Sequence, residues 1–238
     1  MSHVKNVHAF GKLTGICTGY GGQYNPGQQN LQVEAMTTLM ISAQQALAAV
    51  NEAQAFYDKA TNQRELGFKN VRRLSSSVWL VLKASGAGPL TVRDAYQIKR
   101  KIWGARKAKR KADAAAAEAG VKPGPFIYGN DYGTLVNYFA QLVATVENEP
   151  RYTPNESRLT LSGLQQKLAE LKMLNETVTQ AEIQLTQARR ERNELFYLQE
   201  GNLVSTAIAA KNYIRGVFGF QSSQHNEVSQ LDFRKPRM

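Results

Sequence analysis

Between Pro154 and Gly201 the chain carries a run of apolar side chains with no further proline and no strong turn signal. Leucine, valine and alanine recur in steps of about three and four residues, close to heptad spacing. The members of this stripe are Leu164, Leu168, Leu171, Leu174, Val178, Ala181, Leu185, Ala188 and Leu195. The spacing predicts one long helix over residues 154–200, about 65 Å in length. No compact domain of this size buries such a helix alone, so a second long helix must pack against it.

Residues 31–66 are the expected partner of the long helix. Their apolar positions again alternate in steps of four and three, and many are alanines that let a neighbouring helix approach closely. The positions are Leu39, Ala43, Ala46, Val50, Ala53, Tyr57 and Ala60. The chain is therefore expected to be all-α: an elongated helical bundle built on two long antiparallel helices. The similarity of ATNQREL (60–66) to ARRERNEL (188–195) also suggests two related helical hairpins.

Start signals set the expected helix boundaries. Thr153, Pro154 and Glu156 combine a cap, a proline at the first helical position and a capping-box acid. Thr91 followed by Asp94 predicts the start of a second capped helix, and Asp131 the start of a third. The expected organisation is an arm over 1–30, a helical bundle over 31–220 with a basic helix over 91–119, a loop over 120–130 and the long helix over 154–200, and a tail over 221–238.

The first thirty residues are rich in glycine, tyrosine and asparagine, and GYGGQYNPGQQN (19–30) shows no helical period. Ordering so many glycines costs conformational entropy, so this segment is expected to be a flexible arm. Tyr20 and Tyr24 are candidate self-association contacts on that arm. The alternative is that both tyrosines hold the arm against its own bundle.

The stretch KRKIWGARKAKRK (99–111) holds eight Lys or Arg residues and no acid, in a chain whose net charge is +11. Such a local excess indicates one contact face for an anionic partner. On a helix, most of these cations share one arc with a tryptophan. The candidate binding residues are Lys99, Arg100, Trp103, Arg106, Lys107, Arg110 and Lys111. An acidic protein surface, a nucleic acid and an anionic membrane are alternative partners, and a merely solvated helix face is the structural alternative.

Residues with catalytic or metal-binding potential are few. The three histidines stand in no His-x-x-x-His or Glu-x-x-His pattern, and no carboxylates cluster at ligand spacing. No phosphate-binding glycine motif follows a strand pattern, and Cys17 has no evident base. The expected protein is not an enzyme and has no metal site and no cofactor.

One cysteine allows no intramolecular disulfide, and residues 1–22 contain no signal-peptide pattern. The most apolar run, Val78–Leu82, is far shorter than the roughly 20 residues that a spanning helix needs. The sequence thus predicts a cytoplasmic protein without a transmembrane segment, unless it is exported by a route that needs no such signal.

The C-terminal half resembles a group of uncharacterised bacterial helical proteins. The shared features are YTPNES (152–157), a long helix ending in ARRERNEL, and the segment KNYIRGVFGFQSSQHNEVSQLDF (211–233). The matching positions are Val217, Phe218 and Gly219 at the V-F-G break, and Val228, Ser229, Leu231 and Phe233 in the V-S-x-L-x-F tail; His225 stands where that group has tyrosine. The segment LKASGAGPLTVRDA (82–95) is also similar, so the resemblance covers about residues 60–110 and 150–235. It implies a helical architecture and no known activity.

The function expected first is structural: a self-associating homo-oligomer that uses its arm and its long helices. The second hypothesis is a nucleic-acid-binding or anionic-surface-binding helical protein that uses residues 99–111. The third is a soluble component of a helical pore-forming toxin, which needs an apolar segment able to enter lipid.

Overall fold

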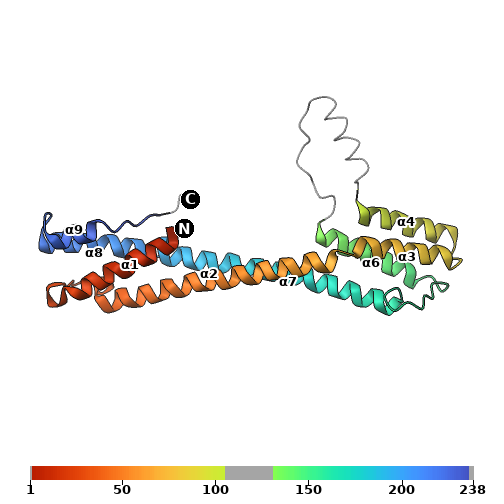
Figure 1. Ribbon diagram of the computed structural model, residues 1–238, viewed down its shortest axis with the longest axis horizontal. Coiled ribbons are helices and arrows are strands. Elements are labelled where there is room, and N and C mark those ends of the chain that lie inside the picture. Colours follow the sequence, from red (N-terminus) through yellow and green to blue (C-terminus); the bar gives the residue numbers. More distant parts are fainter. Residues whose placement is uncertain (1, 105–130, 236–238) are drawn as a thin grey trace, which may run out of the picture. The chain divides into compact units, whose positions relative to one another are not determined.

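The computed structural model describes residues 2–104 and 131–235 of the 238-residue chain. In these two stretches every regular element is a helix, and they contain no strand (Figure 1). The prediction of an all-α protein is confirmed.

The chain divides into two compact units. Unit 1 combines residues 1–57 with residues 181–238, and unit 2 is the continuous segment 58–180. The two longest helices, α2 (Val33–Phe68) and α7 (Leu161–Asn193), each contribute residues to both units.

The two long helices pack against each other, as their stripes predicted. In unit 2, Arg64 Nη1 donates to Asn175 Oδ1 at 3.3 Å, and a Cβ added to Gly67 would lie 2.3 Å from Leu174 Cδ1. In unit 1, Arg189 Nη2 donates to Gln54 Oε1 at 2.8 Å. Later residues of α2 pair with earlier residues of α7, so the helices are antiparallel. The buried members of the two stripes are Ala43, Ala60, Leu164, Leu171, Val178, Ala181 and Leu185.

The start expected for the long helix at residue 154 is wrong. Residues 152–160 form a turn in which the Tyr152 hydroxyl donates to the Leu159 carbonyl at 2.9 Å, and both side chains are buried. Thr160 caps the helix instead, because its hydroxyl accepts from the Gly163 amide at 3.2 Å. Burial of Tyr152 and Leu159 thus outweighs the local start signal, and α7 begins at Leu161. At its other end α7 passes into a short π-helical turn, η3 (Glu194–Leu198).

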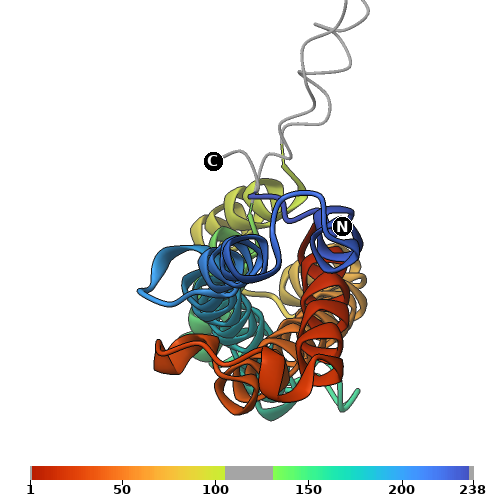
Figure 2. The same ribbon diagram turned by 90° about the vertical axis from the view of Figure 1, so that its left-hand side faces the viewer.

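The expected flexible arm is also wrong, because residues 2–19 form a helix of unit 1, α1 (Ser2–Gly19). Its inner face is fully buried at Phe10, Leu13 and Cys17. These side chains belong to one core with α8 (Leu203–Phe218). Figure 2 looks onto this unit, with the N-terminal helix in red and the C-terminal helices in blue.

The remaining elements of unit 1 complete the same core. The short turns η1 (Gly21–Gln23) and η2 (Gln29–Leu31) lead from α1 into α2. Asn202 caps α8 by accepting from the Ser205 amide at 2.9 Å. The expected tail contains a further helix, α9 (Ser223–Ser229).

Over its described residues, unit 2 adds three helices to its parts of α2 and α7. They are α3 (Val71–Ala84), α4 (Pro89–Trp103) and α6 (Tyr132–Glu147), and their apolar faces meet in a second core. Asp131 caps α6 as predicted, since its carboxylate accepts from the Thr134 amide at 2.9 Å.

The predicted helix over 91–119 differs from α4 at both ends. Gly88 is the N-cap, and Pro89 occupies the first turn, where its missing N–H costs nothing. Gly104 follows α4 in the left-handed region at φ 72°, and its amide bonds back to Arg100 and Lys101. The remaining residues of the expected basic helix, and the expected loop over 120–130, lie outside the described residues.

Candidate functional site

Three of the seven predicted anion-binding residues lie on the last two turns of α4. These are Lys99, Arg100 and Trp103. The other four, Arg106, Lys107, Arg110 and Lys111, fall outside the described residues. The geometry of the candidate site can therefore be followed along α3 and α4, as far as Gly104.

Helices α3 and α4 follow each other along the chain and pack together. Each buries one face and leaves a second face with the spacing i, i+3 and i+7. Val78 and Leu82 of α3, and Ala95 and Ile102 of α4, are completely buried. The outward side chains form what we call the cation–aromatic surface: Ser76, Trp79 and Lys83 on α3, and Tyr96, Lys99 and Trp103 on α4.

Two aromatic rings form the centre of this surface. The centroids of Trp79 and Tyr96 are 5.2 Å apart, and their ring planes are tilted by 47°. The Trp79 indole N–H donates to the Val92 carbonyl at 3.3 Å, which fixes the ring against α4. Tyr96 is 37% exposed, so one side of the pair faces solvent.

The two lysines lie over these rings. Lys99 Nζ is 4.9 Å from the centroid of Trp79 and 5.2 Å from that of Tyr96. Lys83 Nζ is 5.8 Å from the Trp79 centroid. Both lie within the roughly 6 Å over which an ammonium is attracted to a ring face. The rings thus hold two positive charges at defined positions on the protein surface.

Trp103 extends the aromatic surface by one helical turn. Its indole N–H donates to Ser76 Oγ at 2.9 Å, and the residue is 37% exposed. The hydrogen bond ties the end of α4 to α3 and orients an indole ring whose surface stays partly open.

Charge around this surface is strongly one-sided. Helix α3 carries no acid, and the only acid of α4 is Asp94, which pairs with Arg93 at 3.8 Å. Residues 71–103 contain seven Lys or Arg residues and one Asp, a net charge of +6. Within residues 2–104 and 131–235, neither Lys83 nor Lys99 forms an ion pair with a carboxylate. Their charges are free to meet an external anion.

The two tyrosines expected to contact another copy are engaged within unit 1. Tyr24 is buried; its hydroxyl donates to the Leu31 carbonyl at 2.9 Å and its ring meets Tyr213 edge-on at 5.4 Å. The Tyr20 ring packs on Phe218 at 5.2 Å and its hydroxyl donates to Glu227 at 3.1 Å. Burial, followed by the Glu227 carboxylate, raises the pKa of Tyr20 to about 12. Both tyrosines hold their segment against its own unit.

The rarer reactive side chains are in unit 1. Cys17 is buried, and burial raises the pKa of its thiol to about 11. Burial, followed by the charge of Arg192, lowers the pKa of His3, whose Nδ1 lies 2.9 Å from the Tyr197 hydroxyl. No group of three or more His, Cys, Asp or Glu side chains in the described part of the chain could hold a metal ion.

Of this surface, the sequence pattern indicated Lys99 and Trp103 but not Trp79, Lys83 or Tyr96. A signal for them exists, because Tyr96, Lys99 and Trp103 share one helix face at i, i+3 and i+7. In the sequence Trp79 belongs to the apolar run Val78–Leu82, and nothing local shows that it faces Tyr96. That contact depends on the packing of α3 against α4.

Comparisons with known proteins add no function. The chain matches no protein-family model, no curated protein and no solved structure. The resemblance to bacterial helical proteins therefore stays a prediction. Over residues 2–104 and 131–235, no helix is both long enough and apolar enough to cross a membrane.

Proposed function

We propose that this protein is a non-enzymatic helical binding protein that holds single-stranded nucleic acid on the cation–aromatic surface. The observation that carries the proposal is the position of Lys99 over the paired rings of Trp79 and Tyr96, with the partly exposed indole of Trp103 one turn further along α4. Single-stranded nucleic acids are bound by such combinations of cations for phosphates and aromatic rings for bases.

The charge distribution supports the same partner. The surface lies on a segment with a net charge of +6. Directly after Gly104 the sequence adds five more cations, Arg106, Lys107, Lys109, Arg110 and Lys111. Phosphate contacts by such a segment release counterions, so affinity must fall as salt rises. Cations alone would attract any polyanion, whereas the aromatic rings of the cation–aromatic surface favour unpaired bases that can stack on them.

Binding of a fluorescent oligonucleotide of about 20 nucleotides, followed by anisotropy over a salt series, tests this proposal. The double variant Lys99→Gln/Arg100→Gln is expected to weaken binding and to reduce the salt slope by about 0.7 for each phosphate that is no longer neutralised. Trp103→Ala is expected to cost about 1–3 kcal/mol, which is the usual loss of one stacked base. Lys172→Gln, an exposed lysine of α7 in the same unit, is the matched control.

Three comparison ligands decide between partners: duplex DNA, vesicles with anionic lipid and an acidic peptide. Preference for the single strand that depends on Trp103 supports the proposal. Equal binding to every polyanion, or an effect of Lys172→Gln as large as that of the double variant, would show charge attraction alone and contradict it.

A second candidate function, self-association, is supported by apolar side chains exposed on the long helices. Leu66 and Met173 in unit 2 are 68% and 60% exposed, and Ile183 in unit 1 is 61% exposed. Light scattering at low and at physiological salt tests this function, with Leu66→Lys, Met173→Lys and Ile183→Lys as variants. Defined oligomers that dissociate in these variants support it, and a monomer at both salt concentrations rejects it.

A further inference from the structure

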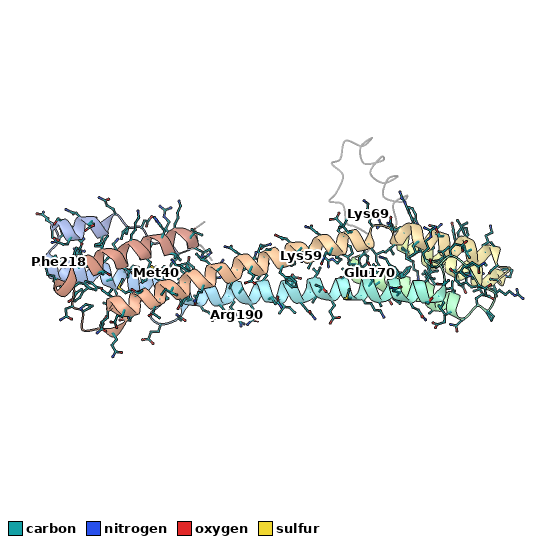
Figure 3. All side chains as sticks on the ribbon, turned by 60° about the horizontal axis from the view of Figure 1, so that its bottom comes forward. Met40, Lys59, Lys69, Glu170, Arg190 and Phe218 are labelled. Carbon is teal, nitrogen blue, oxygen red and sulfur yellow. The ribbon has the colours of Figure 1, made fainter. Side chains whose placement is uncertain are left out.

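A polar groove of about 880 Å³ lies in unit 2, away from the cation–aromatic surface. One side is formed by the first turns of α3, the other by the turn before α7 and the first three turns of α7 itself. Glu170, labelled in Figure 3, lies on the α7 side. None of the six residues of the cation–aromatic surface lines the groove, so the groove is a second site with a ligand of its own.

Two arginines line this groove from separate elements. Arg73 comes from α3, and Arg158 comes from the turn that precedes α7. In the described part of the chain neither arginine pairs with a carboxylate. The third cation, Lys167, is neutralised by Glu170 at 2.9 Å. The groove therefore keeps two guanidinium groups for an external anion.

The turn that carries Arg158 is held rigidly on the first turn of α7. The Thr160 hydroxyl donates to the Ser157 carbonyl at 2.8 Å and accepts from the Gly163 amide at 3.2 Å. A Cβ at Gly163 would lie 2.0 Å from the Ser157 carbonyl oxygen, so only glycine lets the turn approach this closely. Ser157 and Arg158 are thus positioned beside the positive end of a 33-residue helix, which also favours an anion.

The rest of the lining offers further polar groups to a ligand. Ser77 and Ser157 offer hydroxyls, and Asn70 and Gln166 offer side-chain amides. Leu74 is the only apolar side chain that lines it in the described residues. The volume falls in the range of about 300–1,000 Å³ that is usual for small-molecule sites. Guanidinium groups bind phosphate oxygens in a bidentate manner, and hydroxyl and amide groups suit the hydroxyls of a sugar.

We propose that this groove binds a small phosphate monoester with a hydroxyl-rich body, with Arg73 and Arg158 on the phosphate. Sugar phosphates and nucleotides both fit this description, because both carry a phosphate and a sugar with free hydroxyls. The two sources are separated by the probes of the experiment.

Isothermal titration calorimetry of the full chain tests the site with ribose 5-phosphate, AMP, inorganic phosphate and ribose. Ribose 5-phosphate or AMP is expected to bind at least tenfold more tightly than inorganic phosphate, and ribose is expected not to bind. Tighter binding of AMP than of ribose 5-phosphate identifies the ligand as a nucleotide. Equal affinity for the two identifies the ligand as a sugar phosphate, because the adenine then contributes nothing.

Variants locate the binding in the groove. Arg73→Gln and Arg158→Gln are each expected to weaken ester binding at least tenfold, and Arg73→Lys is expected to recover only part of it, because lysine keeps the charge but not the fork. Arg93→Gln, an exposed arginine of α4 outside the groove, is the control. Circular dichroism confirms that each variant is folded.

Three outcomes would overturn the assignment: no heat with either ester at millimolar concentration, inorganic phosphate binding as tightly as the esters, or equal losses in Arg73→Gln, Arg158→Gln and Arg93→Gln. Oligonucleotide binding measured on the same variants keeps this site separate from the proposed function. Arg158→Gln, which lies outside residues 71–103, is expected to leave that binding unchanged.

Discussion

At the scale of single residues, the inner face of α1 shows how burial changes chemical behaviour. Cys17 would be a reactive thiol on a flexible arm, but it lies in the core of unit 1, 0% exposed. Burial raises the pKa of the thiol to about 11, because the low-dielectric core disfavours the thiolate. The reactivity of Cys17 is therefore a measure of whether unit 1 is folded.

We expect Cys17 to resist alkylation by iodoacetamide at pH 8 and to react once the protein is unfolded in denaturant. The reason is that the thiol is both inaccessible and protonated at that pH. Thr18→Cys adds an exposed thiol at the next position and is expected to be modified rapidly in the folded protein. Rapid labelling of Cys17 itself under native conditions would contradict the burial of α1. Mass spectrometry measures both reactions.

His3 is expected to make the stability of unit 1 depend on pH. The Tyr197 hydroxyl, which accepts from Asn6 at 3.2 Å, lies 2.9 Å from Nδ1 of His3. Burial lowers the pKa of His3 below its ordinary value of about 6.5. The unfolded chain therefore binds the proton first, so the stabilisation present above about pH 6.5 is lost as the pH falls.

Urea unfolding at pH 7.5 and pH 5.5 measures this effect. The wild-type protein should lose stability at the lower pH, and His3→Gln should flatten that dependence. His8→Gln removes an exposed histidine from the same helix and should keep the wild-type dependence. Identical pH profiles for His3→Gln and the wild type would contradict the role of His3.

At the scale of elements, the sequence predicted a helix correctly wherever periodicity was strong. The stripes of α2 and α7 and the cap at Asp131 required only local information. For α1 the signal was present but was outweighed by its glycines. Phe10, Leu13 and Cys17 recur at i, i+3 and i+7, whereas Gly11, Gly15 and Gly19 lower helix propensity. Packing against α8 provides the stability that local propensity lacks.

Gly15→Ala is expected to raise the free energy of unfolding by about 0.5–1 kcal/mol, the usual difference between glycine and alanine inside a helix. An added Cβ there meets nothing within 4 Å. Gly11→Ala should gain less, because its Cβ would lie 3.2 Å from Met40 Sδ, on a side chain labelled in Figure 3. Thermal and denaturant unfolding measure both variants. No gain from Gly15→Ala would indicate that residues 2–19 are not helical in solution.

The candidate site shows the same limit of local information. Lys99 and Trp103 were visible in the sequence because they belong to the basic stretch 99–111, whereas Lys83 was not. The pairing of Trp79 with Tyr96, and of Trp103 with Ser76, joins residues of two helices and depends on how α3 packs on α4. The groove was invisible for the same reason: Arg73 and Arg158 line one groove only through the turn that Gly163 allows.

At the scale of the whole molecule, the chain carries a natural probe in each unit. Both tryptophans, Trp79 and Trp103, belong to unit 2, and the single cysteine belongs to unit 1. Tryptophan fluorescence therefore follows unit 2, and thiol protection follows unit 1. In unit 1, Asn6 links α1 to the C-terminal segment. Its side-chain amide donates to the Arg234 carbonyl at 2.8 Å, and its side-chain oxygen accepts from the Arg234 backbone amide at 3.1 Å.

Asn6→Ala is expected to destabilise unit 1 by about 1–3 kcal/mol, because it removes two hydrogen bonds to the Arg234 backbone, each usually worth about 0.5–1.5 kcal/mol. The denaturant midpoint for exposure of Cys17 should fall, and the midpoint seen by tryptophan fluorescence should shift less. Asn212→Ala, at an exposed position of α8, is the control and should move neither midpoint. An unchanged thiol midpoint in Asn6→Ala would mean that this contact does not hold the chain end.

Unit 1 is built from two segments that are far apart in the sequence, and this sets the order in which the two units can fold during translation. Unit 2 is one continuous segment and can fold as soon as it has emerged, whereas the first half of unit 1 must wait for residues after 180. Asn6 and Arg234 are 228 positions apart, an interval of roughly 11–46 s at translation rates of about 5–20 residues per second. During that interval Phe10, Leu13 and Cys17 lack their α8 partners. The nascent chain thus exposes the apolar face of its N-terminal segment while its central segment is already complete, and exposed apolar surface of this kind favours aggregation.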